Sequence, residues 1–125
     1  MLEQTQYVDQ PDELRAGSEI EFITTTVTLR TGELERGAVL GKIDAGETGA
    51  GEFVLSASAA TNGSEKPYAI LLHDADASEA AQDVVVLLAG IVNEGALSFG
   101  AGHTADSVRW PLRELGIYLR TTVGA

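Results

Sequence analysis

The sequence predicts an α+β fold that is mostly β: a small single domain of short strands with one C-terminal helix, preceded by an extended N-terminal arm. Three observations lead to this prediction. Short β-branched and apolar runs alternate with turn residues, and 14 of the 125 residues are glycine. One segment near the C-terminus has helical spacing. The first 21 residues are acidic and poor in apolar side chains, and the total length suits one compact domain.

The N-terminal segment, residues 1–21, differs in composition from the rest of the chain. It holds six acidic residues and one basic residue, Arg15. Its few apolar side chains bury too little surface to offset the entropy lost on ordering. Two interpretations remain open: a frayed terminus, or an arm that becomes ordered on a partner.

Six strands are expected after this segment. Turn signals separate them at Thr31-Gly32, Asn62-Gly63 and Asn93-Glu94-Gly95. The run Val84–Val92 is the strongest and is apolar enough to be buried on both faces. We expect a flexible acidic loop at 44–51 and a loop or single helical turn at 74–82. The expected strands are 22–29, 34–43, 52–58, 69–73, 84–92 and 117–123.

The one expected helix has Val108, Leu112 and Leu115 on its apolar face. Gly116 fits its C-terminal stop. Pro111 is compatible with a helix if it lies in the first turn, where its missing N–H costs little. The candidates for the N-cap are Thr104, Asp106 and Ser107. Trp110, the only tryptophan, and Leu112 are expected to anchor the core or a contact between subunits.

The charge balance argues against two classes of partner. Nineteen acidic residues face eight basic ones, which gives a formal net charge of −11. Nucleic-acid binders neutralise phosphates with Lys and Arg, so we expect no direct binding of DNA or RNA. Attraction to an anionic membrane is disfavoured for the same reason. The N-terminus lacks the features of a signal peptide and the apolar runs are short, so we expect a protein made in the cytoplasm and kept or assembled there.

No residue pattern predicts catalysis, a cofactor or a metal. The chain has no cysteine, which excludes disulfides and zinc–thiolate sites. The His73–Glu79 region carries carboxylates but lacks the calcium-loop pattern, and we interpret it as a solvated loop at a strand end. His103 lies in a glycine-rich loop, where a surface or interface role is expected. No serine occupies a nucleophile elbow, and neither glycine cluster completes a phosphate-binding motif. We therefore expect that the protein is not an enzyme.

Three segments resemble the head decoration proteins of tailed phages, the lambda protein D-like family. They are Leu29–Ile43 (LRTGELERGAVLGKI), Pro67–Leu97 (PYAILLHDADASEAAQDVVVLLAGIVNEGAL) and Val108–Val123 (VRWPLRELGIYLRTTV). The match is one of segment order and residue character over roughly residues 20–123. It implies a β-rich decoration domain at 22–125 and a flexible capsid-binding arm at 1–21.

The resemblance also implies a function. Family members form homotrimers at the three-fold and quasi-three-fold positions of an expanded capsid and stabilise the shell against the pressure of packaged DNA. This implies a location on the outer capsid surface of the virion, after assembly in the host cytoplasm. The implied partners are the major capsid protein and further copies of the chain, with Trp110 and Leu112 as candidate trimer anchors. The arm would add a strand to the capsid protein through Leu2, Gln4, Gln6, Tyr7 and Val8.

Two alternatives remain open from the residues alone. One is a small β-barrel ligand-binding or carrier module, although neither Lys42 nor Lys66 sits in the tight hairpin that carries an attachment lysine. The other is an enzyme that uses His73 and Asp74. A stable trimer in solution, free of metal or ligand, would favour the decoration protein over both.

Overall fold

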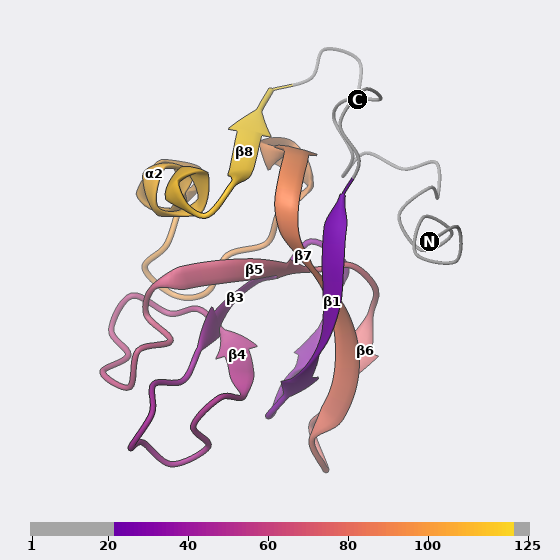
Figure 1. Cartoon of the computed structure of the whole chain (residues 1–125), viewed down its shortest axis with the longest axis vertical. Coiled ribbons are helices and arrows are strands. Elements are labelled where there is room, and N and C mark those ends of the chain that lie inside the picture. The colour runs from indigo at the N-terminus through magenta and orange to yellow at the C-terminus, as the bar shows by residue number, and fades with distance from the viewer. Residues whose placement is uncertain (1–21, 122–125) are drawn as a thin grey trace.

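The computed structural model describes residues 22–121 and has a β-rich body with one α-helix near its C-terminal end (Figure 1). This confirms the predicted fold class. The arm expected at residues 1–21 and the end of the 117–123 strand lie outside the described residues. The elements are β1 (Ile23–Leu29), β2 (Glu33–Leu34), β3 (Val39–Lys42), β4 (Phe53–Leu55), β5 (Pro67–Leu71), β6 (Ala75–Asp76), β7 (Gln82–Asn93), the 3₁₀ helix η1 (Glu94–Ala96), α2 (Ala105–Glu114) and β8 (Ile117–Arg120).

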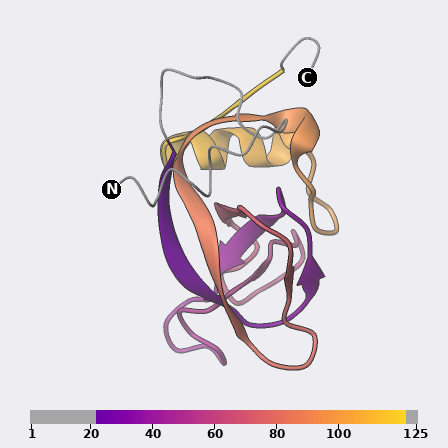
Figure 2. The same ribbon diagram turned by 90° about the vertical axis from the view of Figure 1, so that its right-hand side faces the viewer.

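Five strands close into a barrel in the order β1-β4-β3-β5-β7, because β7 also pairs with β1. The 12-residue β7 is the strand that makes this closure. It runs antiparallel to β1 from Gln82 to Ala89, and Figure 2 shows the two strands curving side by side. On its other edge β7 pairs first with β5 and then, in parallel, with β8. The strand β8 thus extends the wall beyond the barrel.

The wall formed by β3, β5 and β7 is buried on both faces. Side chains alternate along strands, so neighbouring residues enter different clusters. The paired residues Leu71 and Val86 point into the barrel, whereas the paired residues Ile70 and Leu87 point outward to α2 and β8. This explains why the Val84–Val92 run is continuously apolar, as predicted. The inner cluster is Leu29, Ala38, Leu40, Phe53, Ala69, Leu71, Ala77, Val84 and Val86.

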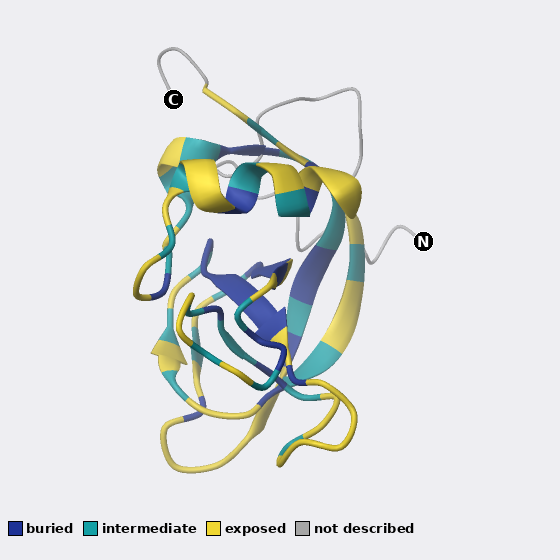
Figure 3. Cartoon of the chain, turned by 90° about the vertical axis from the view of Figure 1, so that its left-hand side faces the viewer, coloured by how far each residue is buried: buried dark blue, intermediate teal, exposed yellow. Residues whose placement is uncertain are grey.

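The helix α2 covers the outer face of this wall. Val108 and Leu112, one helical turn apart, are fully buried in the outer cluster with Ile117 of β8. Figure 3 shows the buried positions of α2 facing the barrel and its exposed positions facing away. Gly116, with φ of 99°, ends the helix and lets the chain reverse into β8.

The N-cap of α2 is Thr104, one of the three candidates. The Thr104 side chain accepts a hydrogen bond from the Ser107 N–H, and the Ser107 hydroxyl accepts one from the Thr104 N–H. Pro111 does not lie in the first turn, where its missing N–H would cost little, because it is the seventh residue of the helix. The reciprocal cap and the buried face hold α2 together although Pro111 removes one internal hydrogen bond.

Two local expectations also need correction. The strand expected at 34–43 is two strands, because Gly37 adopts a φ of 102° and separates β2 from β3. The segment expected to be a loop or helical turn at 74–82 contains β6, which pairs with β2. The turn expected at Asn93-Glu94-Gly95 is present, as the three-residue 3₁₀ helix η1 capped by the Asn93 side chain, and needs no correction. Each correction depends on a pairing or a backbone angle that short-range composition does not encode.

Candidate interaction surfaces

His73 stabilises the junction between β5 and β7. Its Nε2 accepts a hydrogen bond from the Val85 N–H at 3.0 Å, and its Nδ1 lies 3.0 Å from the Asp74 carbonyl oxygen. Since Nε2 is an acceptor, the proton belongs on Nδ1, which donates to that carbonyl. Both ring nitrogens are therefore engaged with the backbone, which is the arrangement of a structural histidine.

His103 connects the start of α2 to the segment before β5. Its Nε2 lies 2.9 Å from the Glu65 carbonyl oxygen and its Nδ1 lies 2.8 Å from the Ser107 hydroxyl. A carbonyl oxygen only accepts, so Nε2 carries the proton and donates it. His103 thus joins the capped end of α2 to the barrel.

Residues 22–121 contain no group of three or more His, Cys, Asp or Glu side chains arranged to hold a metal ion. Within the same residues, no helix has the length and apolar character needed to cross a membrane. The barrel interior is filled by the inner cluster, whose large side chains Leu29, Leu40 and Leu71 are fully buried. The surfaces left to consider lie on the outside of the body.

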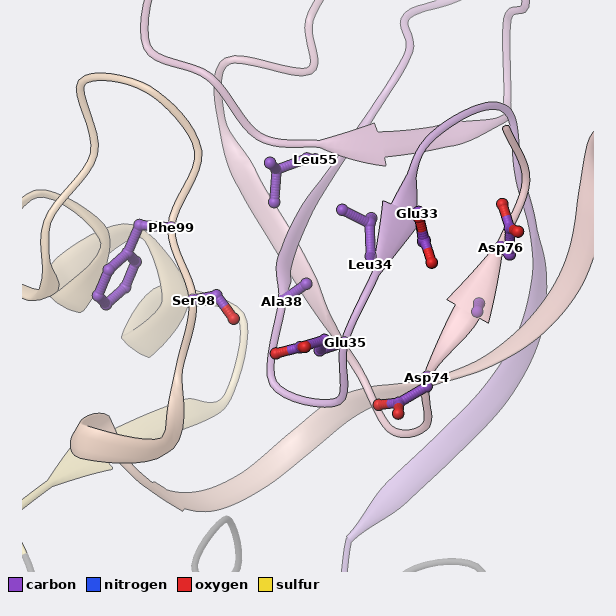
Figure 4. A pocket seen from close by; sticks show the side chains of 10 residues that line it. Glu33, Leu34, Glu35, Ala38, Leu55, Asp74, Asp76, Ser98 and Phe99 are labelled. Carbon is purple, nitrogen blue, oxygen red and sulfur yellow. The ribbon is translucent and has the colours of Figure 1, made fainter. Parts of the chain in front are cut away.

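The first surface is the acidic groove, an open depression of about 620 Å³ beside β2 and β6. Its carboxylates come from Glu33, Glu35, Asp74 and Asp76, and its apolar lining includes Leu34, Leu55 and Phe99. In Figure 4 the leucines lie in the middle of the view, with Phe99 on the opposite loop and Glu35 and Asp74 at one end. The groove therefore offers an apolar floor with a negative rim.

The pairing of β2 with β6 builds the rim. Its register places Glu33 directly opposite Asp76 and Leu34 opposite Ala75. Two carboxylates at facing positions repel each other. The hydroxyl and the N–H of Ser78 both donate to Asp76, and these two hydrogen bonds lower the pKa of Asp76 below its ordinary value. Asp74 in turn accepts a hydrogen bond from the Arg36 N–H at 2.9 Å.

The second surface is the basic aromatic patch, formed by Arg109, Trp110 and Arg113 of α2 with Tyr118 of β8. Trp110 is 62% exposed and Tyr118 is 45% exposed. The Arg113 guanidinium lies 5.7 Å from the centre of the Trp110 ring and 5.8 Å from that of Tyr118. A cation between two aromatic faces is attracted to both rings. Arg113 therefore holds the two exposed rings as one surface.

Arg109 fixes the base of the patch. It forms an ion pair with Glu94 of η1 at 2.8 Å, and this carboxylate raises the pKa of Arg109. Tyr118 and Arg120 lie two residues apart on β8, so they share a face of the strand. Three of the seven basic residues within 22–121, namely Arg109, Arg113 and Arg120, thus belong to α2 and β8.

The structure separates the two residues predicted as anchors. Leu112 is fully buried in the outer cluster, whereas Trp110 belongs to neither core cluster and lies on the surface. The predicted arm contacts Leu2, Gln4, Gln6, Tyr7 and Val8 lie outside the described residues. Sequence reasoning missed Arg113, although its position three residues after Trp110 on a helix was a usable signal. It also missed the acidic groove, which depends on the long-range pairing of β2 with β6.

Comparison with protein families identifies a family for the chain. The protein-family model described as bacteriophage lambda head decoration protein D matches residues 4–116 of the chain. The search of the curated proteins found no match. The family match covers nearly all of the described body and most of the segment that precedes it.

Proposed function

The chain belongs to the family of the bacteriophage lambda head decoration protein D, and its role is structural decoration of a phage capsid; from this premise we propose a specific mode of action. The protein forms a homotrimer on the outer surface of the expanded capsid, at three-fold and quasi-three-fold positions, and stabilises the shell against the pressure of packaged DNA. The family match over residues 4–116 is the observation that carries this proposal. We further propose that the protein has no catalytic activity and assembles in the host cytoplasm.

Residues 1–21 act as the capsid-binding arm, and 22–125 form the decoration domain. Leu2, Gln4, Gln6, Tyr7 and Val8 contact the major capsid protein, with main-chain hydrogen bonds of an added strand providing much of the affinity. The family match begins at residue 4, which supports a family role for this segment. The start of β1 at Ile23 pairs with Ala89 of β7, next to the point where β8 joins β7 at Gly90, so the described body begins at the end that carries α2 (Figure 1).

Trimer formation makes weak arms effective. One arm loses conformational entropy when it becomes ordered, which limits the affinity of a single contact. Three arms on one trimer bind together, and their avidity exceeds the affinity of one arm by orders of magnitude. The packed barrel interior supports this structural role over the ligand-binding or carrier alternative, since the inner cluster occupies the space that a ligand would need.

Binding to purified heads tests the proposal. Full-length protein should bind undecorated expanded heads and raise the temperature at which they release DNA, and it should bind unexpanded heads poorly. Deletion of residues 1–21 should leave a folded trimer that no longer binds. Equal binding to expanded and unexpanded heads would contradict selective recognition of the expanded shell. Full binding by the truncated protein would show that the body, and not the arm, makes the contact with the capsid.

A further inference from the structure

We propose that the basic aromatic patch of one copy binds in the acidic groove of the next copy, and that three such contacts close the trimer. This inference rests on the proposed function, because it assigns the surfaces that hold the proposed trimer together. Each copy would contribute its patch to one neighbour and its groove to the other. Each contact thus joins two copies of the chain through two different surfaces, the patch of one copy and the groove of the other.

The charges of the two surfaces are complementary. The chain carries a formal charge of −11, so copies repel one another unless opposite charges meet at the contact. The patch brings Arg113, which has no ion pair among the described residues and lies between two exposed rings. The groove brings Glu33 and Glu35, which also have no ion-pair partner in the part of the chain that the structure describes. Complementary charges of this kind specify partner and register.

The apolar side chains of the two surfaces also suit each other. Trp110 is the most exposed large apolar side chain in the described residues. An exposed tryptophan beside an arginine is typical of the side chains that dominate binding energy at interfaces, where they enter pockets on the partner. Leu34, Leu55 and Phe99 give the groove an apolar floor inside its negative rim. The indole would bury its apolar face on this floor while Arg113 reaches the carboxylates.

A contact between two different surfaces has a definite consequence for assembly. Such head-to-tail contacts form a closed ring when the rotation between copies returns to its start, and an open chain when it does not. A ring of three leaves no patch and no groove unused. If the basic aromatic patches of the three copies contacted one another around the three-fold axis instead, every acidic groove would stay empty. Cross-linking separates the two arrangements.

The first experiment removes the anchor. The double variant Trp110→Ala, Arg113→Ala changes only exposed side chains, so its circular dichroism should match that of the wild type. Each contact should weaken about 30-fold or more, and the mass in solution should fall from three chains to one at micromolar concentration. The control Ile23→Ala, Lys66→Ala removes an exposed apolar side chain and a positive charge elsewhere, and it should remain trimeric. An unchanged trimer in the Trp110/Arg113 variant would overturn the proposal.

The second experiment uses the absence of cysteine from the natural chain. Glu114 lies one helical turn after Trp110 and Ser98 lines the groove, so cysteines at these two positions leave the proposed contact charges in place. A variant with Glu114→Cys and Ser98→Cys, treated with a short bismaleimide, should give covalent trimers on a denaturing gel. Each single-cysteine variant alone should give no covalent product, whereas a mixture of the two should give covalent dimers. The control pair Lys66→Cys, Glu47→Cys should stay uncrosslinked. Dimers from the Glu114→Cys variant alone would show a patch-to-patch contact and overturn the inference.

The outcomes distinguish this inference from the proposed function. The wild type could be a trimer that binds expanded heads while the double-cysteine variant gives no covalent trimer. That result would refute the assigned surfaces and leave the decoration role intact. Wild-type protein that stays monomeric and does not bind heads would refute the proposed function itself. Covalent trimers that still bind heads would support both.

Discussion

At the scale of single residues, Ser56 is a buried polar group on which two segments of the barrel depend. Its side chain is fully buried, and its hydroxyl donates to the Ser64 carbonyl oxygen at 2.8 Å. Its N–H donates to the Val39 carbonyl oxygen, which ties the end of β4 to β3. The Ser56 hydroxyl thus satisfies a carbonyl that water does not reach.

We expect Ser56→Ala to lower the free energy of unfolding by about 1–3 kcal/mol, because the Ser64 carbonyl oxygen loses its donor while it stays buried. Urea denaturation of the two proteins measures this difference. Ser58→Ala is the matched control, since Ser58 is exposed, and it should change stability by less than about 0.5 kcal/mol. Equal effects of the two substitutions would show that the Ser56 hydroxyl contributes no specific stabilisation.

Asp76 gives a second prediction at this scale, because its pKa is lowered by the side-chain and backbone hydrogen bonds from Ser78. Ser78→Ala removes the hydroxyl hydrogen bond, which is the larger of the two causes, so the pKa of Asp76 should rise toward its ordinary value. A folded-state pKa below the unfolded value stabilises the fold above the unfolded pKa, and this contribution disappears as the pH falls through the folded pKa. The variant should therefore lose less stability on acidification. NMR titration of the Asp76 carboxyl measures the shift, and Ser78→Thr, which keeps a hydroxyl, should preserve the low pKa.

At the scale of elements, α2 combines an unfavourable residue with two compensating features. Pro111 removes one internal hydrogen bond, and the helix has only ten residues, too few to be stable alone. The Thr104–Ser107 capping box satisfies the first N–H groups, and Val108 and Leu112 bury one face on the barrel. The rigid helix that results presents Trp110 and Arg113 outward, so its cap has consequences for the basic aromatic patch.

Thr104→Ala should lower the free energy of unfolding by about 1 kcal/mol, because the cap bond to the Ser107 N–H is lost. If the helix start frays in the folded state, hydrogen exchange of the α2 amides should also accelerate. Thermal denaturation and exchange monitored by NMR test both effects. The exposed Thr61 provides the control, since Thr61→Ala should leave α2 exchange unchanged. Unchanged stability in the Thr104 variant would mean that packing alone holds the helix.

At the scale of the whole molecule, local patterns predicted the elements and long-range pairings determined their arrangement. The spacing of Val108 and Leu112 predicted α2, and the unbroken apolar run predicted β7, because both signals are contained in neighbouring residues. Barrel closure joins β1 to β7, and the acidic groove needs β2 to meet β6 about 40 residues away in the sequence. The residues around each of these strands do not indicate which distant strand it will pair with. Trp110 was predicted as an anchor, but its position outside the core depends on which helix face meets the barrel.

The shared wall of β3, β5 and β7 predicts that the barrel and the α2–β8 layer unfold together. Leu71 and Val86 pack inside the barrel while their neighbours Ile70 and Leu87 hold α2, so loss of the wall removes support from both clusters. Small single domains of this kind unfold in one cooperative transition. The backbone amide resonances of Val108 and Leu112 report α2, and far-ultraviolet circular dichroism reports the sheet. Within the wild type the two probes should give the same urea midpoint, and within Leu71→Ala they should again agree with each other. The midpoint of the variant should be lower, because its free energy of unfolding should fall by about 2–5 kcal/mol. An earlier loss of the Val108 and Leu112 signals would mean that α2 and β8 form a separate unit, docked on a barrel that folds without them.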